Sequence, residues 1–301
     1  MDGETLIGIP TYNGHRRVEA LLANLRQRTP RDIPHRVVVC DDSGKDRHRR
    51  LVREACARYA AVYIENERNL GVPASWNRLV RSSPDCPYAV LLNDDVLVDD
   101  GWLRPLVHAV SRNPKAASFS LHCHFITEQD APAILCGPGA KAIPLNVHWR
   151  GGRLVRDERF PSMPGPPEDT TPGRVMCPAG CAFGFRREVY DAVGGFDERY
   201  FAFYEETDFG VSCAARGMPS FTLTVPWDNY HIWSATFGSA PEINAGRVMR
   251  ESRGKFVEKW SARLGVGFND APEIHHLLMD RIPPTEISWL CRDGTERRGA
   301  L

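Results

Sequence analysis

The sequence has no excess of charge of either sign, no dense cysteine framework and no long apolar run. Its 38 Lys and Arg residues balance 38 Asp and Glu residues, whereas a dedicated nucleic-acid-binding domain usually has a basic excess. The nine cysteines are odd in number and scattered, which predicts free thiols rather than a disulfide scaffold. No apolar run approaches the ~20 residues of a membrane span. We therefore expect a soluble, cytoplasmic protein, with work at a membrane surface left open and nucleic acid disfavoured as a partner.

Two common nucleotide-binding motifs are also missing. There is no P-loop, and no dinucleotide fingerprint follows the first strand-like run, which argues against an ATPase and a dehydrogenase. The composition is that of an ordinary globular protein, with 42% hydrophobic and 25% charged residues. A chain of 301 residues is long enough for one large domain or two small ones.

The first 121 residues alternate strand-like and helix-like segments. Short apolar runs lie at 6–10, 37–40, 62–64, 88–92 and 116–121. Helix-length segments separate them, so the strands need crossover connections and the sheet should be mainly parallel. Such open sheets bind ligands beyond the carboxyl ends of their strands. The ends of these runs are therefore where the chemistry is expected.

The second half is less regular. Residues 151–175 hold many Pro and Gly residues and predict a long loop. Both a lid that orders when a ligand binds and plain disorder fit such a loop. Residues 182–185 and 221–225 predict strands, and 204–215 predict a helix. After about residue 240 the apolar spacing indicates a further helix.

Acidic and amide side chains follow two of the predicted strands. Asn93 and Asp95 flank Asp94 at the end of one, and alternation in a strand turns the outer two to the same side. Side-chain oxygens are the ligands that Mg²⁺ and Mn²⁺ prefer, although the triplet taken alone favours an ordinary acidic turn at a strand end. Asp41 and Asp42 end another strand, where a turn or helix cap and a contact to a nucleotide base or ribose both fit.

Taken together, six segments resemble the inverting family 2 glycosyltransferases, and their overall look is closest to the rhamnosyltransferase-like branch. No single segment is specific, but their order and spacing are. The matching segments are 9–13, 39–44, 69–71 with Asn77, 91–96, 194–198 and 204–208.

The resemblance implies the α/β fold called GT-A: a mainly parallel central sheet with helices on both faces, a smaller acceptor-side subregion and C-terminal helices. It implies a nucleotide-sugar-binding half at 1–121 and an acceptor-binding and catalytic half of the same domain at 122–240. Residues 241–301 are then expected to be a C-terminal helical extension.

The resemblance also implies a metal-dependent, hexosyltransferase-type enzyme. Its donor would be a nucleotide-diphosphate sugar and its acceptor a hydroxyl group on a glycan, a lipid-linked sugar, a natural product or another molecule. The implied cofactor is Mn²⁺ or Mg²⁺, with Asp95, Asn93 and His231 as ligands. The implied donor-binding residues are Pro10, Thr11, Tyr12, Asn13, Asp41, Asn69, Gly71, Asn77, Asn93 and Asp94.

By register with the family, Glu206 is the catalytic base, and Glu205 is the alternative. A plain helix N-terminus, where acidic residues are favourable, explains the same pair without catalysis. Asp208, Trp233 and Tyr204 are expected on the acceptor side. The chain departs from the family at Asn93, which replaces an aspartate and brings one negative charge fewer to the metal.

Two other functions remain open from the sequence. A sugar nucleotidyltransferase also uses aspartate-held metal, but it normally has a Gly-rich loop where this chain has 11–14. A catalytically inactive, GT-A-like sugar-binding protein would fit the asparagine in the metal motif. A zinc site from 122–124 with Cys177 and Cys181 is disfavoured, because the ligands lack a tight paired spacing.

Overall fold

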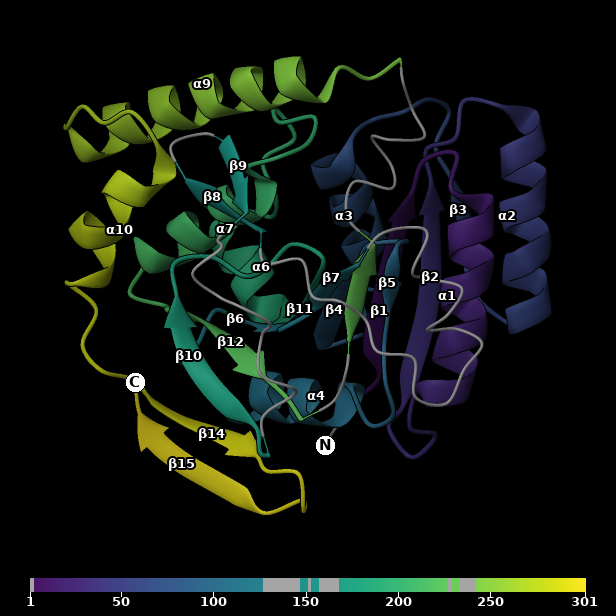
Figure 1. The fold of residues 1–301 in the computed structure, drawn as a ribbon, viewed down its shortest axis with the longest axis horizontal. Helices are drawn as coiled ribbons and strands as arrows, with labels where there is room; N and C mark the ends of the chain where they lie inside the picture. Colours follow the sequence, from purple (N-terminus) through teal and green to yellow (C-terminus); the bar gives the residue numbers. More distant parts are fainter. Residues whose placement is uncertain (1–2, 127–146, 151–152, 157–167, 227–228, 233–241) are drawn as a thin grey trace.

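The computed structural model describes residues 3–126, 147–150, 153–156, 168–226, 229–232 and 242–301. An eight-stranded sheet runs through its centre (Figure 1). In sheet order its strands are β10 (Thr171–Val175), β12 (Ser220–Thr224), β6 (Ser118–Leu121), β11 (Ala182–Arg186), β4 (Tyr88–Leu92), β1 (Thr5–Thr11), β2 (His35–Asp41) and β3 (Val62–Glu65).

The sheet is mainly parallel, as predicted. β1 pairs in parallel with β2 and β4, β2 with β3, and β12 with β6. β11 is antiparallel to both of its neighbours, β4 and β6. The amino end of β11 therefore lies at the carboxyl edge of the parallel strands, where ligands bind in sheets of this kind.

Helices cover both faces of the sheet because successive strand residues point to opposite sides. Leu6 and Val38 join one apolar core, and their chain neighbours Ile7 and Val39 join the other. The helices are α1 (His15–Arg28), α2 (Asp46–Tyr59), α3 (Val72–Arg81), α4 (Leu103–Arg112), α6 (Arg187–Val193), α7 (Glu205–Ala214), α9 (Ala245–Leu264) and α10 (Ala271–Met279). In α1, four buried apolar residues recur at helical spacing, which is the pattern that predicted it.

A small second sheet lies beside the first, in the order β5 (Val96–Leu97), β13 (Tyr230–Ile232) and β7 (His124–Ile126). A further pair joins β8 (Val147–Arg150) to β9 (Arg153–Arg156). The long loop predicted for 151–175 is thus wrong for β9 and for β10. Pro172 and Gly173 are unusual in a strand, so the sequence of β10 does not indicate one. β10 is an edge strand of the large sheet, however, and a proline is tolerated at such a position.

The C-terminal part is only partly helical. α9 and α10 pack with α7 around a third apolar cluster that contains Phe256 and Trp260. The chain then forms a hairpin of β14 (Glu286–Leu290) and β15 (Glu296–Ala300), so the helical extension expected for 241–301 ends in a pair of strands. The turn holds Asp293 and Gly294, a strong hairpin signal, with Gly294 at φ +85°.

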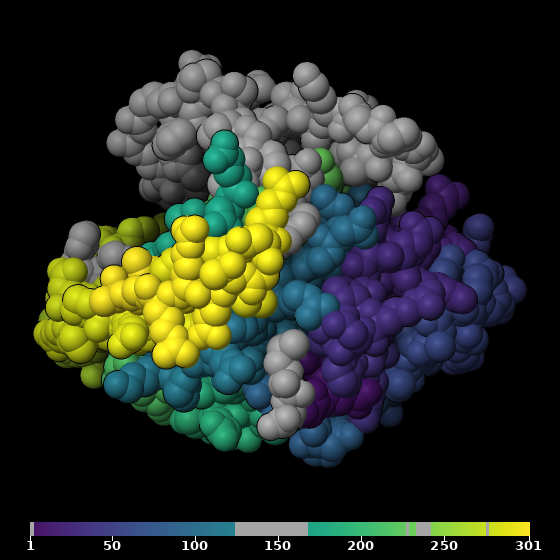
Figure 2. Space-filling model, turned by 90° about the horizontal axis from the view of Figure 1, so that it is seen from below, coloured from purple at the N-terminus to yellow at the C-terminus, as the bar shows by residue number. Residues whose placement is uncertain are grey.

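The hairpin packs on α4, where Asn113 exchanges hydrogen bonds of 2.7 and 2.8 Å with the backbone of Ser288. In Figure 2 it covers part of one face of the molecule. Among the described residues, none of the helices combines the length and apolar content needed to cross a bilayer.

Candidate active site

The carboxyl ends of β1 and β4 are tied together by Asp94. Its carboxylate accepts hydrogen bonds from the Thr11 hydroxyl at 2.6 Å and from Arg17 Nε at 3.0 Å. Burial raises the pKa of Asp94, while Arg17 and Thr11 oppose that rise. Gly14 makes room for this contact, since a Cβ there would lie 2.1 Å from Asp94 Oδ2. Thr11 and Asp94, expected to bind the donor, therefore bind each other and shape the strand ends.

Arg17 is a site residue that sequence reasoning missed. It lies in the first turn of α1, and its guanidinium also reaches the backbone oxygen of Tyr12 at 3.4 Å. A single arginine on a helix carries no motif, so nothing in the sequence distinguishes it from its neighbour Arg16.

Asp41, at the end of β2, is fully buried. Its two carboxylate oxygens accept from Ser43 N at 2.8 Å and from the Tyr63 hydroxyl at 3.1 Å. The next residue, Asp42, accepts from Ser75 Oγ at 2.8 Å and from Asn66. These contacts agree with the turn role left open by the sequence, and the donor contact expected of Asp41 stays a prediction.

The loop after β1 meets the loop before α3. Asn13, at φ +52°, donates its backbone N–H to Ser43 Oγ at 2.9 Å, and its buried Oδ1 has no hydrogen-bond partner among the described residues. The Tyr12 hydroxyl donates to Glu242 Oε1 at 2.8 Å and also interacts with Asn69. Tyr12, Asn13 and Asn69, three predicted donor-binding residues, thus lie together, while Pro10 precedes them, partly buried, in β1.

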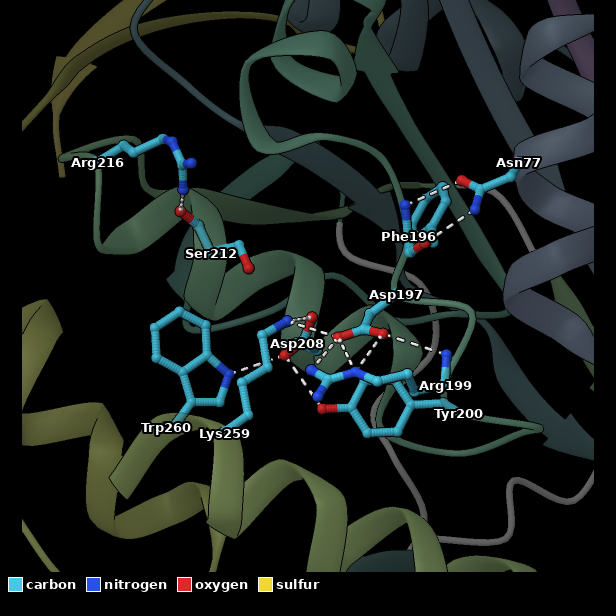
Figure 3. A network of polar contacts seen from close by, with 10 residues as sticks. All are labelled: Asn77, Phe196, Asp197, Arg199, Tyr200, Asp208, Ser212, Arg216, Lys259 and Trp260. Atoms are coloured by element: carbon cyan, nitrogen blue, oxygen red, sulfur yellow. Dashed lines mark hydrogen bonds and ion pairs between the residues drawn. The ribbon is translucent and has the colours of Figure 1, made fainter. Parts of the chain in front are cut away.

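Asn77 is hydrogen-bonded within the protein. Its amide nitrogen donates to Phe196 O at 2.8 Å, and its amide oxygen accepts from Phe196 N at 2.9 Å (Figure 3). The nitrogen also donates to Glu198 at 2.7 Å, and the oxygen also accepts from the Tyr190 hydroxyl at 2.9 Å. An asparagine amide offers two donors and two acceptor positions, and these contacts use all of them. In the structure Asn77 holds α3 to the segment that precedes α7, and the donor contact expected of it stays a prediction.

Gly71 acts on the same segment. It has φ +87°, and a Cβ there would lie 2.3 Å from the backbone oxygen of Phe201. Asn69 Oδ1 accepts the Gly71 N–H at 3.0 Å, and the Val72 N–H donates to Phe201 O at 2.8 Å. Gly71 therefore permits a backbone contact rather than touching a donor through a side chain.

The predicted metal ligands Asp95 and His231 meet, although 136 positions separate them. β13 pairs with β5 so that His231 lies opposite Val96, and the Ile232 N–H donates to Asp95 O at 2.9 Å. His231 Nε2 lies 3.1 Å from Asp95 Oδ1, with 13% and 6% of the side chains exposed. Burial lowers the pKa of His231, but the Asp95 carboxylate and Cys181 raise it well above its usual range.

This pair fits a divalent cation. Asp95 Oδ1 is buried and, among the described residues, accepts no hydrogen bond beyond its contact with His231. A carboxylate and an imidazole are both usual ligands of such ions. Asn93 is partly exposed beside them, and its backbone N–H donates to Cys181 O at 2.9 Å.

Cys181 lies against His231, and Cys123 lies against Cys181. The antiparallel direction of β11 brings Cys181, one residue before the strand, to this edge, where its thiol contacts Cys123 and His231. The hydrogen bond from Cys123 lowers the pKa of Cys181 to about 5 against the effect of burial. In the part of the chain that is described, the one trio of ligands close enough to share an ion is Glu4, Asp85 and Cys86. The zinc site weighed from the sequence is therefore not formed by Cys123 and Cys181.

The two glutamates begin α7. Phe203 and Tyr204, at φ +64° and +68°, turn the chain sharply into this helix. Glu206 packs on Gly180, where a Cβ would lie 3.3 Å from Glu206 Cγ. Since Cys181 follows Gly180 and contacts His231, these two residues connect the glutamate pair to the predicted metal ligands.

Both carboxylates lie in a poorly solvated environment. Glu205 is 7% exposed, and its Oε2 has no hydrogen-bond partner among the described residues. Burial, and then the neighbouring Glu206, raise the pKa of Glu205 well above its usual range. Burial also raises the pKa of Glu206, with a backbone hydrogen bond opposing it and Cys181 adding to it.

Two residues expected on the acceptor side face the C-terminal helices. The carboxylate of Asp208 accepts from Lys259 Nζ at 2.6 Å and Trp260 Nε1 at 2.8 Å. The hydroxyl of Tyr204 donates to Asp270 at 2.7 Å. The acceptor-side role expected of these two residues stays a prediction, and Trp233 lies outside the described residues.

Comparison with known proteins bears on this site. Residues 6–194 match the model of the family described as glycosyl transferase family 2. A Mycobacterium tuberculosis protein named N-acetylglucosaminyl-diphospho-decaprenol L-rhamnosyltransferase is 27% identical over 221 residues, which are 66% of this chain and 67% of that protein.

Solved structures share the fold. The structure of GalNAc-T7 with UDP, GalNAc and Mn²⁺ has a TM-score of 0.62 at 15% identity, over 99% of this chain and 65% of that one. The Pyrobaculum calidifontis mannosyltransferase PcManGT with GDP-Man and Mn²⁺ has a TM-score of 0.50 at 19% identity, over 73% and 54%. A fragment of S. aureus TarS with UDP has a TM-score of 0.52 at 13% identity, over 84% and 65%.

The chain spans about two thirds or less of these solved chains and about two thirds of the mycobacterial protein. The structural likenesses establish the GT-A fold, and the family match covers more than half of the chain. The protein therefore belongs to glycosyl transferase family 2.

Proposed function

We propose that the protein is a metal-dependent, inverting glycosyltransferase that moves a sugar from a nucleoside-diphosphate donor to a hydroxyl acceptor by single displacement. One arrangement carries the proposal: Asp95 and His231 form a cation site at the carboxyl edge of the sheet, and Gly180 and Cys181 connect it to Glu206. The printed names of the relatives, which include a rhamnosyltransferase and complexes with UDP or GDP-Man, support this class of substrate.

Asp95 and His231 would hold Mn²⁺ or Mg²⁺, with Asn93 beside them as a weaker, uncharged ligand. When bound, such an ion neutralises negative charge on the departing diphosphate. Tyr12, Asn13 and Asn69 lie where the nucleoside part of the donor would bind, and the unpartnered Asn13 Oδ1 is an acceptor for a base or ribose donor group.

Glu206 would accept the proton of the acceptor hydroxyl. As that oxygen attacks the anomeric carbon, the bond from this carbon to the diphosphate oxygen breaks, and the configuration inverts. Burial raises the pKa of Glu206, which makes it a stronger base. Glu205 is the less suitable base because it is more deeply buried, although it adjoins Glu206.

Release of nucleoside diphosphate tests this proposal. UDP-, dTDP- and GDP-sugars are incubated with Mn²⁺ or Mg²⁺ and a panel of hydroxyl acceptors, after a thermal-shift screen has identified the stabilising nucleotide. We expect turnover that requires the ion, and a product of inverted anomeric configuration by NMR. Glu206→Gln should lower kcat by at least about 100-fold while the nucleotide still stabilises the protein.

Glu258→Gln, at an exposed position on α9, is the matched control and should retain full turnover. Release of pyrophosphate instead of nucleoside diphosphate would show a sugar nucleotidyltransferase. Sugar or nucleotide binding without turnover on any acceptor would show a binding protein that keeps the fold.

A further inference from the structure

The C-terminal helix α9 contacts the first turn of α7 through two consecutive residues. Lys259 Nζ donates to Asp208 Oδ2 at 2.6 Å and to Asp197 Oδ2 at 2.9 Å. Trp260 Nε1 donates to the other oxygen of Asp208 at 2.8 Å. Figure 3 shows the ammonium group of Lys259 between the two carboxylates. Residues more than 50 positions apart thus form one buried polar network.

Lys259 is buried in this network. Its side chain is 8% exposed, and those of Asp208 and Asp197 are 4% and 16% exposed, whereas the second cation, Arg199, is 61% exposed. Burial opposes ionisation of Asp197, but Arg199 and Lys259 hold the pKa of that carboxyl well below its usual range. The buried charge of Asp208 is therefore balanced chiefly by Lys259.

Asp208, a member of this network, lies in the same helical turn as the glutamate pair. Three of the first four residues of α7 are acidic: Glu205, Glu206 and Asp208. Like charges within one helical turn repel, and that repulsion is strong where water is excluded. A cation fixed on Asp208 offsets it, and the hydrogen bonds from α9 also fix where the helix begins.

We infer that Lys259 is a positioning residue for catalysis: by neutralising Asp208 and Asp197 from the C-terminal helix, it fixes the first turn of α7 and keeps Glu206 able to ionise at the site. This inference rests on the proposed function, in which Glu206 is the base. In this way α9 contributes to sugar transfer. The hydrogen bonds of Lys259 are to Asp208 and Asp197, not to either glutamate.

The facing groups define what else could titrate there. Asp208 is faced by Lys259 and Trp260 from α9, and by Tyr200 from the preceding segment, with Arg199 nearby. Glu206 is faced by Glu205 in its own helix and by Cys177 and Cys181 from the segment before β11. Removing the charge of Lys259 therefore leaves Asp208 with uncompensated negative charge and changes none of the other groups that face Glu206.

Lys259→Met is the main test, because methionine keeps much of the side-chain volume and removes the charge. We expect kcat to fall at least about tenfold with the donor KM changed less than about threefold, since orientation and not binding is lost. The acid limb of kcat against pH should move up by about one pH unit, because added negative charge makes Glu206 harder to ionise. Lys259→Arg, which keeps the charge, should restore the wild-type limb.

Two further variants keep the test decisive. Lys255→Met is the matched control: this lysine of the same helix donates to the Arg199 backbone oxygen at 2.6 Å and contacts no carboxylate in the described network. The double variant Lys259→Met with Asp208→Asn removes both charges and should return the acid limb towards wild type. A purely structural role predicts the opposite, namely a double variant that is worse than either single change.

A second readout does not depend on turnover. The ¹³Cδ signal of Glu206, assigned through Glu206→Gln, is titrated in wild type and in Lys259→Met, and its midpoint should rise in the variant. Absence of turnover on every donor would overturn the proposed function, while the NMR midpoint would still judge the charge coupling. An unchanged midpoint and an unchanged acid limb, or equal losses in Lys255→Met, would overturn the inference.

Discussion

At the carboxyl edge of the central sheet, the proposed donor-binding side and the proposed catalytic side differ in how their polar groups are paired. On the donor side, Asn77 is saturated by partners within the protein, and Asp41 and Asp94 are each held by two residues. Asn13 Oδ1 is the exception there, since it has no partner among the described residues. On the catalytic side, Glu205 Oε2 has no partner among the described residues, and Asp95 Oδ1 contacts only His231 there. Buried polar groups without partners cost stability, so a protein that retains them is expected to use them. The saturated groups hold the site in shape, and the unsaturated ones are available for chemistry.

The largest expected effect lies on the catalytic side. Asp95→Ala should lower metal-dependent turnover by about 1000-fold, because the carboxylate is the charged ligand of the proposed ion. Nucleoside-diphosphate release against Mn²⁺ concentration measures it. Asp85→Asn is the control, since it removes a carboxylate from the trio of potential ligands with Glu4 and Cys86. If both variants lost turnover equally, the loss in Asp95→Ala could not be assigned to a metal ligand.

On the donor side the effect should be on stability. Asp94→Ala leaves Arg17 and Thr11 without their shared buried partner, and breaking such a pair costs about 3 kcal/mol. Urea unfolding followed by circular dichroism measures it. A variant as stable as wild type would show that these contacts do not hold the strand ends together.

Asn77→Ala should show the same kind of effect at smaller size. The substitution leaves the backbone N–H and oxygen of Phe196 without their partner, at a cost of about 2 kcal/mol in the free energy of unfolding. If Asn77 instead contacts the donor, the variant keeps its stability and loses donor affinity. A thermal-shift titration with the stabilising nucleotide separates the two results.

The strands that could be predicted from the sequence are those with a continuous apolar run of their own. The buried runs of β1, β2 and β4 stand within two residues of their predicted positions, because continuous apolar segments between helices allow few other structures. Motif resemblance placed Asp95, His231 and Glu206, and the structure brings the first two into contact.

What the sequence could not predict is which polar groups are already occupied. Asn77 and Phe196 are 119 positions apart, and Asp208 and Trp260 are 52 apart, so their hydrogen bonds exist only after the chain has folded. A polar residue in a motif looks the same whether a ligand or a distant backbone group satisfies it. β10 was not predicted for a local reason, since an edge strand that contains proline has a weak apolar pattern. The Asp293–Gly294 turn does carry a hairpin signal, but the strand after it, Glu296–Ala300, lacks the apolar alternation that would support it.

The smallest expected effect is on the catalytic side, where removing the ionisable group of Glu205 should stabilise the folded protein. Burial raises the pKa of Glu205 in the folded state, so its ionisation opposes folding. The stability associated with the protonated group is fully present below the unfolded pKa, near the ordinary value of 4.5, and is lost as pH rises through the folded pKa. Glu205→Gln removes this loss, and its free energy of unfolding should exceed that of wild type by about 1 kcal/mol at pH 8 and match it near pH 4. Urea unfolding at both values measures the difference, with Glu258→Gln as the exposed control. A variant less stable than wild type at pH 8 would mean that Glu205 is held by partners, like the aspartates of the donor side, and the two sides would then be built alike.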